Sequence, residues 1–429
     1  MKIFNLKDLN SAERDILLLR PAIKIENTFE IVRPILEDVK KNGLSAALTY
    51  AKKFDNFSGG AIAVSKEEFQ EAEKNLDPNV KKAIQLAAKN IEEFHKLQKS
   101  SGYEIETTEG VKCLREFRAI ESVGLYVPGG SAVLPSTMLM LSIPAKIAGC
   151  KRIVVCSPAK EDGKINDALL YAASFIGVDE FYKLGGAQAV ALMAYGDKEI
   201  KKVSKIFGPG NQFVTAAKLL VSIDLSGCAI DMPAGPSEVL VIADEKSDPS
   251  FVAADLLSQA EHGGDSQVVL LSTSKHLVDL VSSELEIQIS KLPRKDMAKK
   301  ALESSFALIA GNLSEAFDFS NDYAPEHLIL HLEGAESYKD NVINAGSVFL
   351  GQFSPESVGD YASGTNHSLP TYGYARSFGG VTVESFMRSI TFQCLTKQGL
   401  INIASTVETL AEAESLFAHK NAVSIRINK

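Results

Sequence analysis

The sequence predicts an α/β protein with mostly parallel sheets, and two observations lead to this prediction. The first hundred or so residues show the helical spacing of apolar side chains. From Val123 onward, short apolar, β-branched runs alternate with helical stretches. Strands and helices that alternate form parallel sheets covered on both faces, because each crossover helix lies against one face. At 429 residues the chain is too long for one ordinary core, so two or three domains are expected.

The N-terminal elements are expected to be helices. Residues 29–41 show helical apolar spacing, which Gly43 then interrupts. Asp77-Pro78 supplies an N-cap and a first-turn proline for a longer helix that runs to about Gln98.

Eight strands that alternate with helices are expected next. The strands are 123–127, 152–157, 180–184, 238–243, 267–272, 306–310, 327–332 and 347–350. The helices between them include 137–148, 187–194, 211–221 and 249–262. Ligands in such folds collect at the carboxyl ends of the strands, so functional residues are expected there. After about Phe378 the strand signal fades, and Ser405-Thr406-Val407-Glu408 forms a capping box for a final helix toward His419.

The overall charge gives no indication of a nucleic-acid or membrane partner. The formal net charge is −9 and the pI is about 5.5, so nothing draws the chain to a polyanion or an anionic bilayer. Charges scattered through the first twenty residues argue against a secretory signal, and prolines interrupt the most apolar stretch, at 123–150. The five cysteines contain no C-x-x-C pair, which favours buried thiols in a reducing cytoplasm over disulfides or a cysteine zinc site.

Three of the seven histidines lie beside carboxylate or carboxamide groups in the second half of the chain. Gln259 and His262 are three positions apart on a helix that Asp248-Pro249 opens, so their side chains share one face. Such a face offers two ligands to a zinc ion, and a solvated surface has the same pattern.

The other two histidines belong to a dipeptide and a loop. Glu326-His327 enters an apolar run, where a kink lets both side chains reach one cavity as a base and a second proton acceptor. A surface Glu beside a half-buried His is the alternative. Asp360 and His367 lie in a loop rich in glycine and polar residues between apolar segments, and such loops tend to be functional. Asp360 is a candidate metal ligand and His367 a candidate substrate contact.

Three glycine-rich turns, at 126–131, 208–211 and 234–237, present backbone amides that could bind a pyrophosphate. None is the Gly-x-Gly-x-x-Gly dinucleotide fingerprint, because position 213 is Phe. Near the end of the chain, His419 follows Glu414 by five positions, which is about 140° around an ideal helix. These two side chains face one site only if the last turn loosens or a groove wraps the helix.

Taken together, these segments resemble the histidinol dehydrogenase family. The motifs that carry the resemblance occur in one order over nearly the whole chain. They are VGLYVPGG (123–130), LGGAQAV (184–190), FGPGNQFV (207–214), IDMPAGPSE (230–238), DLLSQAEH (255–262), APEHL (324–328), NAG (344–346), GDYASGTNHSLP (359–370) and LFAHKNA (416–422).

The resemblance implies a zinc-dependent enzyme of histidine biosynthesis that oxidises L-histidinol to L-histidine through L-histidinal, with two NAD⁺ used in succession. The implied ligands of one Zn²⁺ per subunit are Gln259, His262, Asp360 and His419. The implied catalytic acid/base pair is Glu326 and His327. The implied NAD contacts are Tyr126, Gln188 and Asn211. The implied substrate contacts are Ser237, Gln259, His262, His327, Asp360, His367, Glu414 and His419.

The resemblance also implies two incomplete Rossmann-like domains and a homodimer. Residues 26–122 and 238–378 would form one domain, which carries the metal and catalytic residues, and residues 123–237 the inserted NAD-binding domain. Residues 1–25 would be an N-terminal segment and residues 379–429 a dimerisation tail. Small helical segments at both ends would interlock two subunits, so that His419 and Glu414 complete the site of the partner.

Two positions depart from the family pattern. Ala362 stands where Gly is common, and Gly263-Gly264 follows His262 where a more polar residue is frequent, which leaves the loop geometry open. Two other functions use the same residues. A zinc-dependent hydrolase acting on a small amide or ester would use the ligands with a Glu base, and a non-catalytic protein would bind a ligand without turnover.

Overall fold

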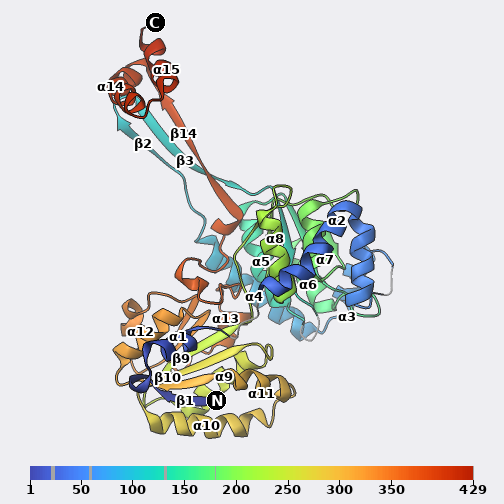
Figure 1. Cartoon of the computed structure of the whole chain (residues 1–429). Helices are drawn as coiled ribbons and strands as arrows, with labels where there is room; N and C mark the ends of the chain where they lie inside the picture. The colour runs from blue at the N-terminus through green and yellow to red at the C-terminus, as the bar shows by residue number, and fades with distance from the viewer. Residues whose placement is uncertain (21–24, 58–59, 130–132, 179, 429) are drawn as a thin grey trace.

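The computed structural model describes residues 1–20, 25–57, 60–129, 133–178 and 180–428. Their strands form sheets of six, five and three strands. Figure 1 shows the two larger sheets in separate halves of the molecule, with the three-stranded sheet projecting as an arm. Among the helices in these ranges, none has both the length and the apolar character that crossing a bilayer requires.

The six-stranded sheet is parallel throughout, with the order β1-β11-β10-β9-β12-β13. Its strands are β1 (Lys2–Asn5), β9 (Glu238–Ala243), β10 (Gln267–Ser272), β11 (Phe306–Ile309), β12 (His327–His331) and β13 (Ser347–Leu350). Every residue of β9, β10 and β12 is buried, which explains their unbroken runs of Val, Ile and Leu.

Helices cover both faces of this sheet and bury its apolar side chains in two cores. The helices of the first face are α9 (Pro249–Ala260), α10 (Lys275–Ile289) and α11 (Lys295–Glu303). The helices of the second face are α1 (Ser11–Leu18) and α12 (Leu313–Tyr323). Val241 of β9 belongs to the first core and Leu240 to the second, because successive residues of a strand point to opposite faces.

The five-stranded sheet is also parallel, with the order β6-β5-β4-β7-β8. Its strands are β4 (Ser122–Tyr126), β5 (Arg152–Cys156), β6 (Glu180–Tyr182), β7 (Lys205–Phe207) and β8 (Ala229–Ile230). The helices on its two faces are α5 (Pro135–Ala148) and α6 (Asp167–Ile176), then α7 (Gly186–Tyr195) and α8 (Gln212–Ile223). Both sheets therefore have the predicted α/β architecture.

The helices of the first hundred residues join this smaller half. α2 (Ile25–Phe54) contacts α7 and α8, α3 (Lys66–Asn75) contacts α6, and α4 (Pro78–Lys96) contacts α5. This packing differs from the predicted domain boundaries, which group residues 26–122 with residues 238–378. Apolar periodicity shows which face of a helix is buried, but it does not show which sheet buries that face.

The predicted elements between residues 123 and 350 are all present, with small shifts at their ends. The two N-terminal signals are also confirmed. Gly43 interrupts α2 with a left-handed φ of 58°, and the Asp77 side chain accepts a hydrogen bond from the Asn79 amide at the start of α4.

The arm was not predicted. It consists of β2 (Tyr103–Thr108), β3 (Val111–Ala119) and β14 (Met387–Leu395), which pair antiparallel, and it carries α14 (Lys397–Ala413) and α15 (Phe417–Ile427) at its tip (Figure 1). The prediction that strand signal fades after Phe378 is wrong. Most of β14 is exposed, so it lacks the apolar run of a buried strand. Ser405 lies inside α14 and does not open the final helix, because Thr396 caps α14 first.

Candidate active site

A cavity of about 290 Å³ lies between the two halves of the molecule. The predicted site residues that line it are Asn211, Ser237, His262, Glu326, His327, Asp360 and His367. Asn211 belongs to the smaller half, whereas the other six lie in or beside the larger one. The fold therefore brings together residues that span more than a third of the chain.

The two sheets present opposite ends of their strands to this cavity. Pro128 and Pro209 lie just beyond the carboxyl ends of β4 and β7 in the smaller sheet. Ser237 precedes β9, and His327 is the first residue of β12, so the larger sheet contributes its amino ends. The cavity therefore lies at the carboxyl ends of the smaller sheet, where ligands were expected, but at the amino ends of the larger sheet.

Three side chains in the cavity region form a candidate metal centre. The ligand atoms of His262, Glu356 and Asp360 all lie within 4.8 Å of one another. Gln259 of α9 is fully buried, and neither atom of its amide has a hydrogen-bond partner among the described residues. Leaving a buried amide unpaired costs about 1–3 kcal/mol, which a metal–oxygen contact would offset. An imidazole, two carboxylates and a carboxamide are ligands that zinc accepts, so the residues fit this ion.

Glu356 is the member of this cluster that the sequence analysis missed. It begins the short helix α13 (Glu356–Tyr361), which also contains Asp360. Residues four apart on a helix lie on the same face, so the two carboxylates point the same way. The spacing of four was visible in the sequence. Because Asp360 was expected to lie in a loop, however, the helical relation between Glu356 and Asp360 was not recognised.

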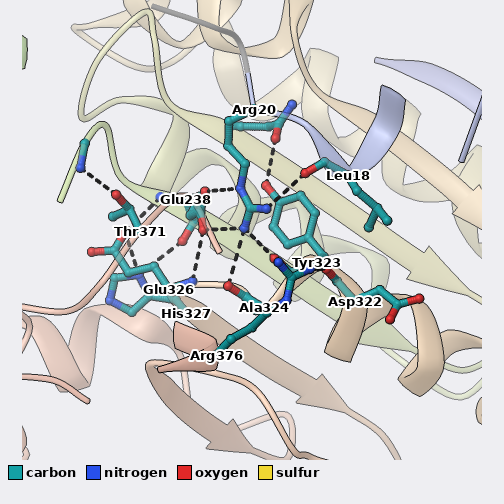
Figure 2. Close-up of polar contacts among 12 residues, drawn as sticks. Leu18, Arg20, Glu238, Asp322, Tyr323, Ala324, Glu326, His327, Thr371 and Arg376 are labelled. Atoms are coloured by element: carbon teal, nitrogen blue, oxygen red, sulfur yellow. Dashed lines mark hydrogen bonds and ion pairs between the residues drawn. The ribbon is translucent and has the colours of Figure 1, made fainter. Parts of the chain in front are cut away.

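Glu326 and His327 are both buried at the start of β12 (Figure 2). The Nδ1–H of His327 donates to the carbonyl oxygen of Glu238 at 3.3 Å, which leaves Nε2 as the proton acceptor. That Nε2 has no hydrogen-bond partner among the described residues and lies 3.6 Å from Asp360 Oδ1. The geometry makes Nε2 the atom available for proton transfer.

Burial and neighbouring charges shift the pKa values of these groups in different directions. Burial raises the pKa of Glu326 to about 8. Burial alone would lower the pKa of His327, but the negative charges of Glu356, Glu326 and Asp360 outweigh it and raise that pKa well above its ordinary value. Burial would raise the pKa of Asp360, yet the interaction with the nearby His327 ring, whose Nε2 lies 3.6 Å from Asp360 Oδ1, holds it below its ordinary range. Shifts of this kind are typical of sites that transfer protons.

His367 is held at the edge of the cavity by two contacts. Its Nε2 lies 2.8 Å from the Thr137 hydroxyl, and its Nδ1–H donates to the carbonyl oxygen of Asp360 at 3.1 Å. Asn366 anchors the same loop, because its side-chain amide donates to the Met140 carbonyl at 2.6 Å and lies 3.5 Å from His95 Nε2. The loop is therefore fixed by both α4 and α5.

The predicted NAD contacts are only partly at the cavity. Asn211 lines it while capping α8, with its side-chain oxygen accepting from the amides of Phe213 and Val214. Tyr126 and Gln188 are buried and bonded elsewhere. The Tyr126 hydroxyl accepts from the Gly186 amide at 3.1 Å, and Gln188 donates to Asp55 at 3.0 Å. Gly130 and Ser131 of the first glycine-rich turn lie outside the described residues.

His419 and Glu414 are not among the residues that line this cavity. His419 lies in α15, and Glu414 is the C-cap of α14, both at the tip of the arm, where they are exposed (Figure 1). Seven of the predicted site residues of a single chain therefore line the cavity. Gln259 is buried on α9, and Tyr126 and Gln188 are buried in the smaller half.

The departures from the family pattern are accommodated by the backbone. Ala362 has a φ of −146°, outside the left-handed region that favours glycine, so glycine is not required there. A Cβ at Gly263 would lie 2.6 Å from the Asp265 carboxylate, and one at Gly264 would lie 2.7 Å from the Lys300 side chain. A side chain at either position would therefore have to displace one of these flexible side chains.

Comparisons with known proteins give one consistent result. The family model described as histidinol dehydrogenase matches residues 18–427. The chain is 52% identical over 412 residues to "Histidinol dehydrogenase" of Bacteroides thetaiotaomicron, covering 96% of each protein. It is 52% identical to "Histidinol dehydrogenase, chloroplastic" of Arabidopsis thaliana, covering 100% of this chain and 91% of the relative. The crystal structure of histidinol dehydrogenase from Elizabethkingia anophelis superposes with a TM-score of 0.95 at 52% identity, covering 100% and 98% of the two chains.

Buried His95 is expected to make stability depend on pH. Burial lowers the pKa of His95 below its ordinary value of 6.5, so the fold holds the neutral ring while the unfolded chain binds a proton more readily. The contribution of His95 is fully present above about pH 6.5 and is lost as the pH falls below it, by up to about 1.4 kcal/mol per pH unit.

The variant His95→Asn keeps a donor toward the Ile91 carbonyl, which His95 Nδ1 contacts at 2.8 Å, but it does not titrate. Urea unfolding at about pH 7.5 and about pH 5.5 should show a smaller loss of stability for this variant than for the original chain. His276→Asn, at an exposed position on α10, serves as the control and should lose as much as the original chain. Equal losses in all three proteins would contradict the prediction.

Proposed function

This chain belongs to the histidinol dehydrogenase family, and from that premise we infer that it oxidises histidinol to histidine in histidine biosynthesis. The observation that carries this inference is a match that extends through both halves of the molecule and hence through both walls of the cavity. The chain is accordingly an oxidoreductase that acts on a small molecule.

We propose that one Zn²⁺ per subunit is held by Gln259, His262 and Asp360, with His419 supplied by a partner subunit. The unpaired amide of Gln259 and the clustered His262 and Asp360 support this set. Glu356 lies in the same cluster and balances the charge of a cation there. When bound, zinc supplies a Lewis acid and a template for a ligand that carries an imidazole and an amine, as histidinol does.

We also propose that NAD⁺ binds against the smaller half. Asn211 lies at the cavity beside the N-terminus of α8, and Tyr126 and Gln188 lie around the start of α7. Backbone amides at helix N-termini favour the negative charge of a pyrophosphate. Two NAD⁺ bound here in succession would each accept one hydride, one in each oxidation.

The position of the arm supports a homodimer with shared sites. Glu414 and His419 are exposed in the single chain, and large apolar residues are exposed around them, including Leu410, Leu416 and Phe417. Exposed apolar residues gathered on a projecting element mark an interaction surface. We propose that the arm of each subunit reaches the cavity of the other, where Glu414 contacts the substrate and His419 the metal.

The proton transfers are assigned to Glu326 and His327, and the other side chains bind the substrate. Nε2 of His327 takes the proton of the alcohol during the first oxidation, and its raised pKa strengthens the neutral ring as an acceptor. Glu326 then takes a proton from water as the water attacks the aldehyde, and His327, after releasing its first proton to solvent, takes the proton of the resulting diol for the second oxidation. Ser237, His262, Asp360 and His367 line the cavity and hold the polar groups of histidinol.

The assay that tests the function combines the full chain with zinc, NAD⁺ and L-histidinol and follows reduced cofactor and histidine together. Since alcohol-to-acid oxidation removes four electrons, two NADH are expected for each histidine formed. Cleavage of small esters without reduction of NAD⁺ would instead indicate a zinc hydrolase. Thermal stabilisation by histidinol without turnover would indicate a binding protein.

The variant Glu326→Gln should separate the two oxidations. It is expected to oxidise histidinol to the aldehyde within about tenfold of the original rate, but to oxidise added histidinal about 10²–10⁴-fold more slowly, because only the second step needs activated water. Glu333→Gln, an exposed position paired with Lys246, is the control and should leave both rates unchanged. Equal loss of both rates would show that the division of roles is wrong.

Complementation between two inactive variants should reveal the shared site. His262→Asn and His419→Asn are each expected to be inactive alone. In mixed dimers, one of the two sites receives His262 from one chain and His419 from the other, both intact. After unfolding and refolding of a one-to-one mixture, about a quarter of the original activity should return if dimers form at random. A mixture as inactive as its components would contradict the sharing of sites.

A further inference from the structure

Arg20 is a buried cation outside the residues that line the cavity. It follows α1, and its side chain is only 6% exposed. The guanidinium grips the Glu238 carboxylate with two parallel hydrogen bonds, from Nε to Oε2 and from Nη2 to Oε1, each of 2.8 Å (Figure 2). Two-pronged pairing of this kind fixes orientation as well as charge.

The remaining donors of Arg20 hold the chain just ahead of the catalytic pair. Nη2 also donates to the Tyr323 carbonyl at 2.6 Å, and the guanidinium lies 3.6 Å from the centre of the Tyr323 ring. Nη1 donates to the Leu18 carbonyl at 3.1 Å. Tyr323 ends α12, and Ala324 follows it in a left-handed conformation with a φ of 51°. Arg20 thus anchors the turn from which Glu326 emerges.

Glu238 connects this cation to both catalytic side chains. Its backbone N–H donates to Glu326 Oε2 at 2.9 Å, and its own Oε1 accepts from the Glu326 amide at 3.3 Å. Its carbonyl oxygen accepts from His327 Nδ1 at 3.3 Å. One residue at the start of β9 therefore orients the Glu326 carboxylate and selects the tautomer of His327.

We propose that Arg20 is a positioning residue for Glu326 and His327, acting through Glu238. Without Arg20, Glu238 would keep a buried carboxylate with no cation, and it would turn away or bind a proton. Either change alters the backbone contacts that orient the catalytic pair. The proposal rests on the roles assigned to Glu326 and His327 under the proposed function.

The test compares Arg20→Met, which removes the charge at similar length, with Arg14→Met. Arg14 pairs with exposed Asp322 at 2.6 Å and belongs to the same N-terminal segment, but it has no contact with Glu238. Arg20→Met should lower kcat for histidinol by about 100-fold, with KM and bound zinc nearly unchanged, because misplacement of catalytic groups slows chemistry more than binding. Arg14→Met should retain the original kcat.

Two further measurements separate positioning from general support of the fold. Added guanidinium at millimolar concentration should recover part of the kcat of Arg20→Met, since it restores the missing donor. Arg20→Met combined with Glu238→Gln should lose no more than Arg20→Met alone, because both changes break one interaction. Should Arg20→Met fail to fold, Arg20→Lys, which keeps the buried charge without the planar fork, is expected to lower kcat by about tenfold.

The outcomes distinguish this proposal from the function on which it rests. An original kcat in Arg20→Met or, if that variant does not fold, in Arg20→Lys, would overturn the proposal. The proposal would also be overturned if the loss of kcat were fully explained by a smaller fraction of folded, zinc-loaded protein. Those results would leave the proposed function intact provided that Glu326→Gln still blocks aldehyde oxidation. If Glu326→Gln retains both oxidations, the assigned roles fail whatever Arg20 does.

Discussion

Buried negative charge is the constraint on which this structure depends. Glu238, Glu326 and Glu356 are each no more than 4% exposed, and Asp360 is 8% exposed. An ionised carboxylate removed from water costs several kcal/mol unless a cation or hydrogen bonds compensate it. Arg20 compensates Glu238, and His327 stands among the other three. Burial raises the pKa of Glu356 well above its ordinary range, so this carboxyl group favours binding a proton or a cation.

This constraint explains why the site combines distant parts of the chain. The carboxylates sit at the amino ends of β9 and β12 and on α13, where the larger sheet meets the smaller one. The Glu238 backbone fixes both side chains, because its N–H donates to Glu326 and its carbonyl oxygen accepts from His327, and Asn366 fixes the loop that carries His367. Each group to which we assign a proton transfer is thus held by a neighbour on another element, which is the arrangement that preorganised catalysis requires.

Much of the fold and the site could be predicted from sequence because the signals are local. Buried parallel strands such as β9 consist of unbroken apolar runs, and motifs such as APEHL and GDYASGTNHSLP mark segments that line the cavity. Relations between distant segments left no such signal. The periodicity of α2 and α4 does not reveal their partner sheet, and the exposed β14 has no apolar run. Glu356 was overlooked because Asp360, its neighbour on α13, was expected to lie in a loop. The use of strand amino ends in the larger sheet contradicted the general rule and could be learned only from the structure.

The pairing of β1 with β11 also bears on how the protein is made. Lys2 lies opposite Phe306, so β1 can pair with β11 only after some three hundred further residues have been synthesised. Residues 25–230, by contrast, contain the whole smaller sheet and the helices that cover it. Nascent chains fold in contiguous units as they emerge, so the smaller half can become compact while the larger half still lacks β11, the strand that pairs with β1. During that interval the apolar side chains near β1 lack a core, and this is when a chaperone would have most to shield.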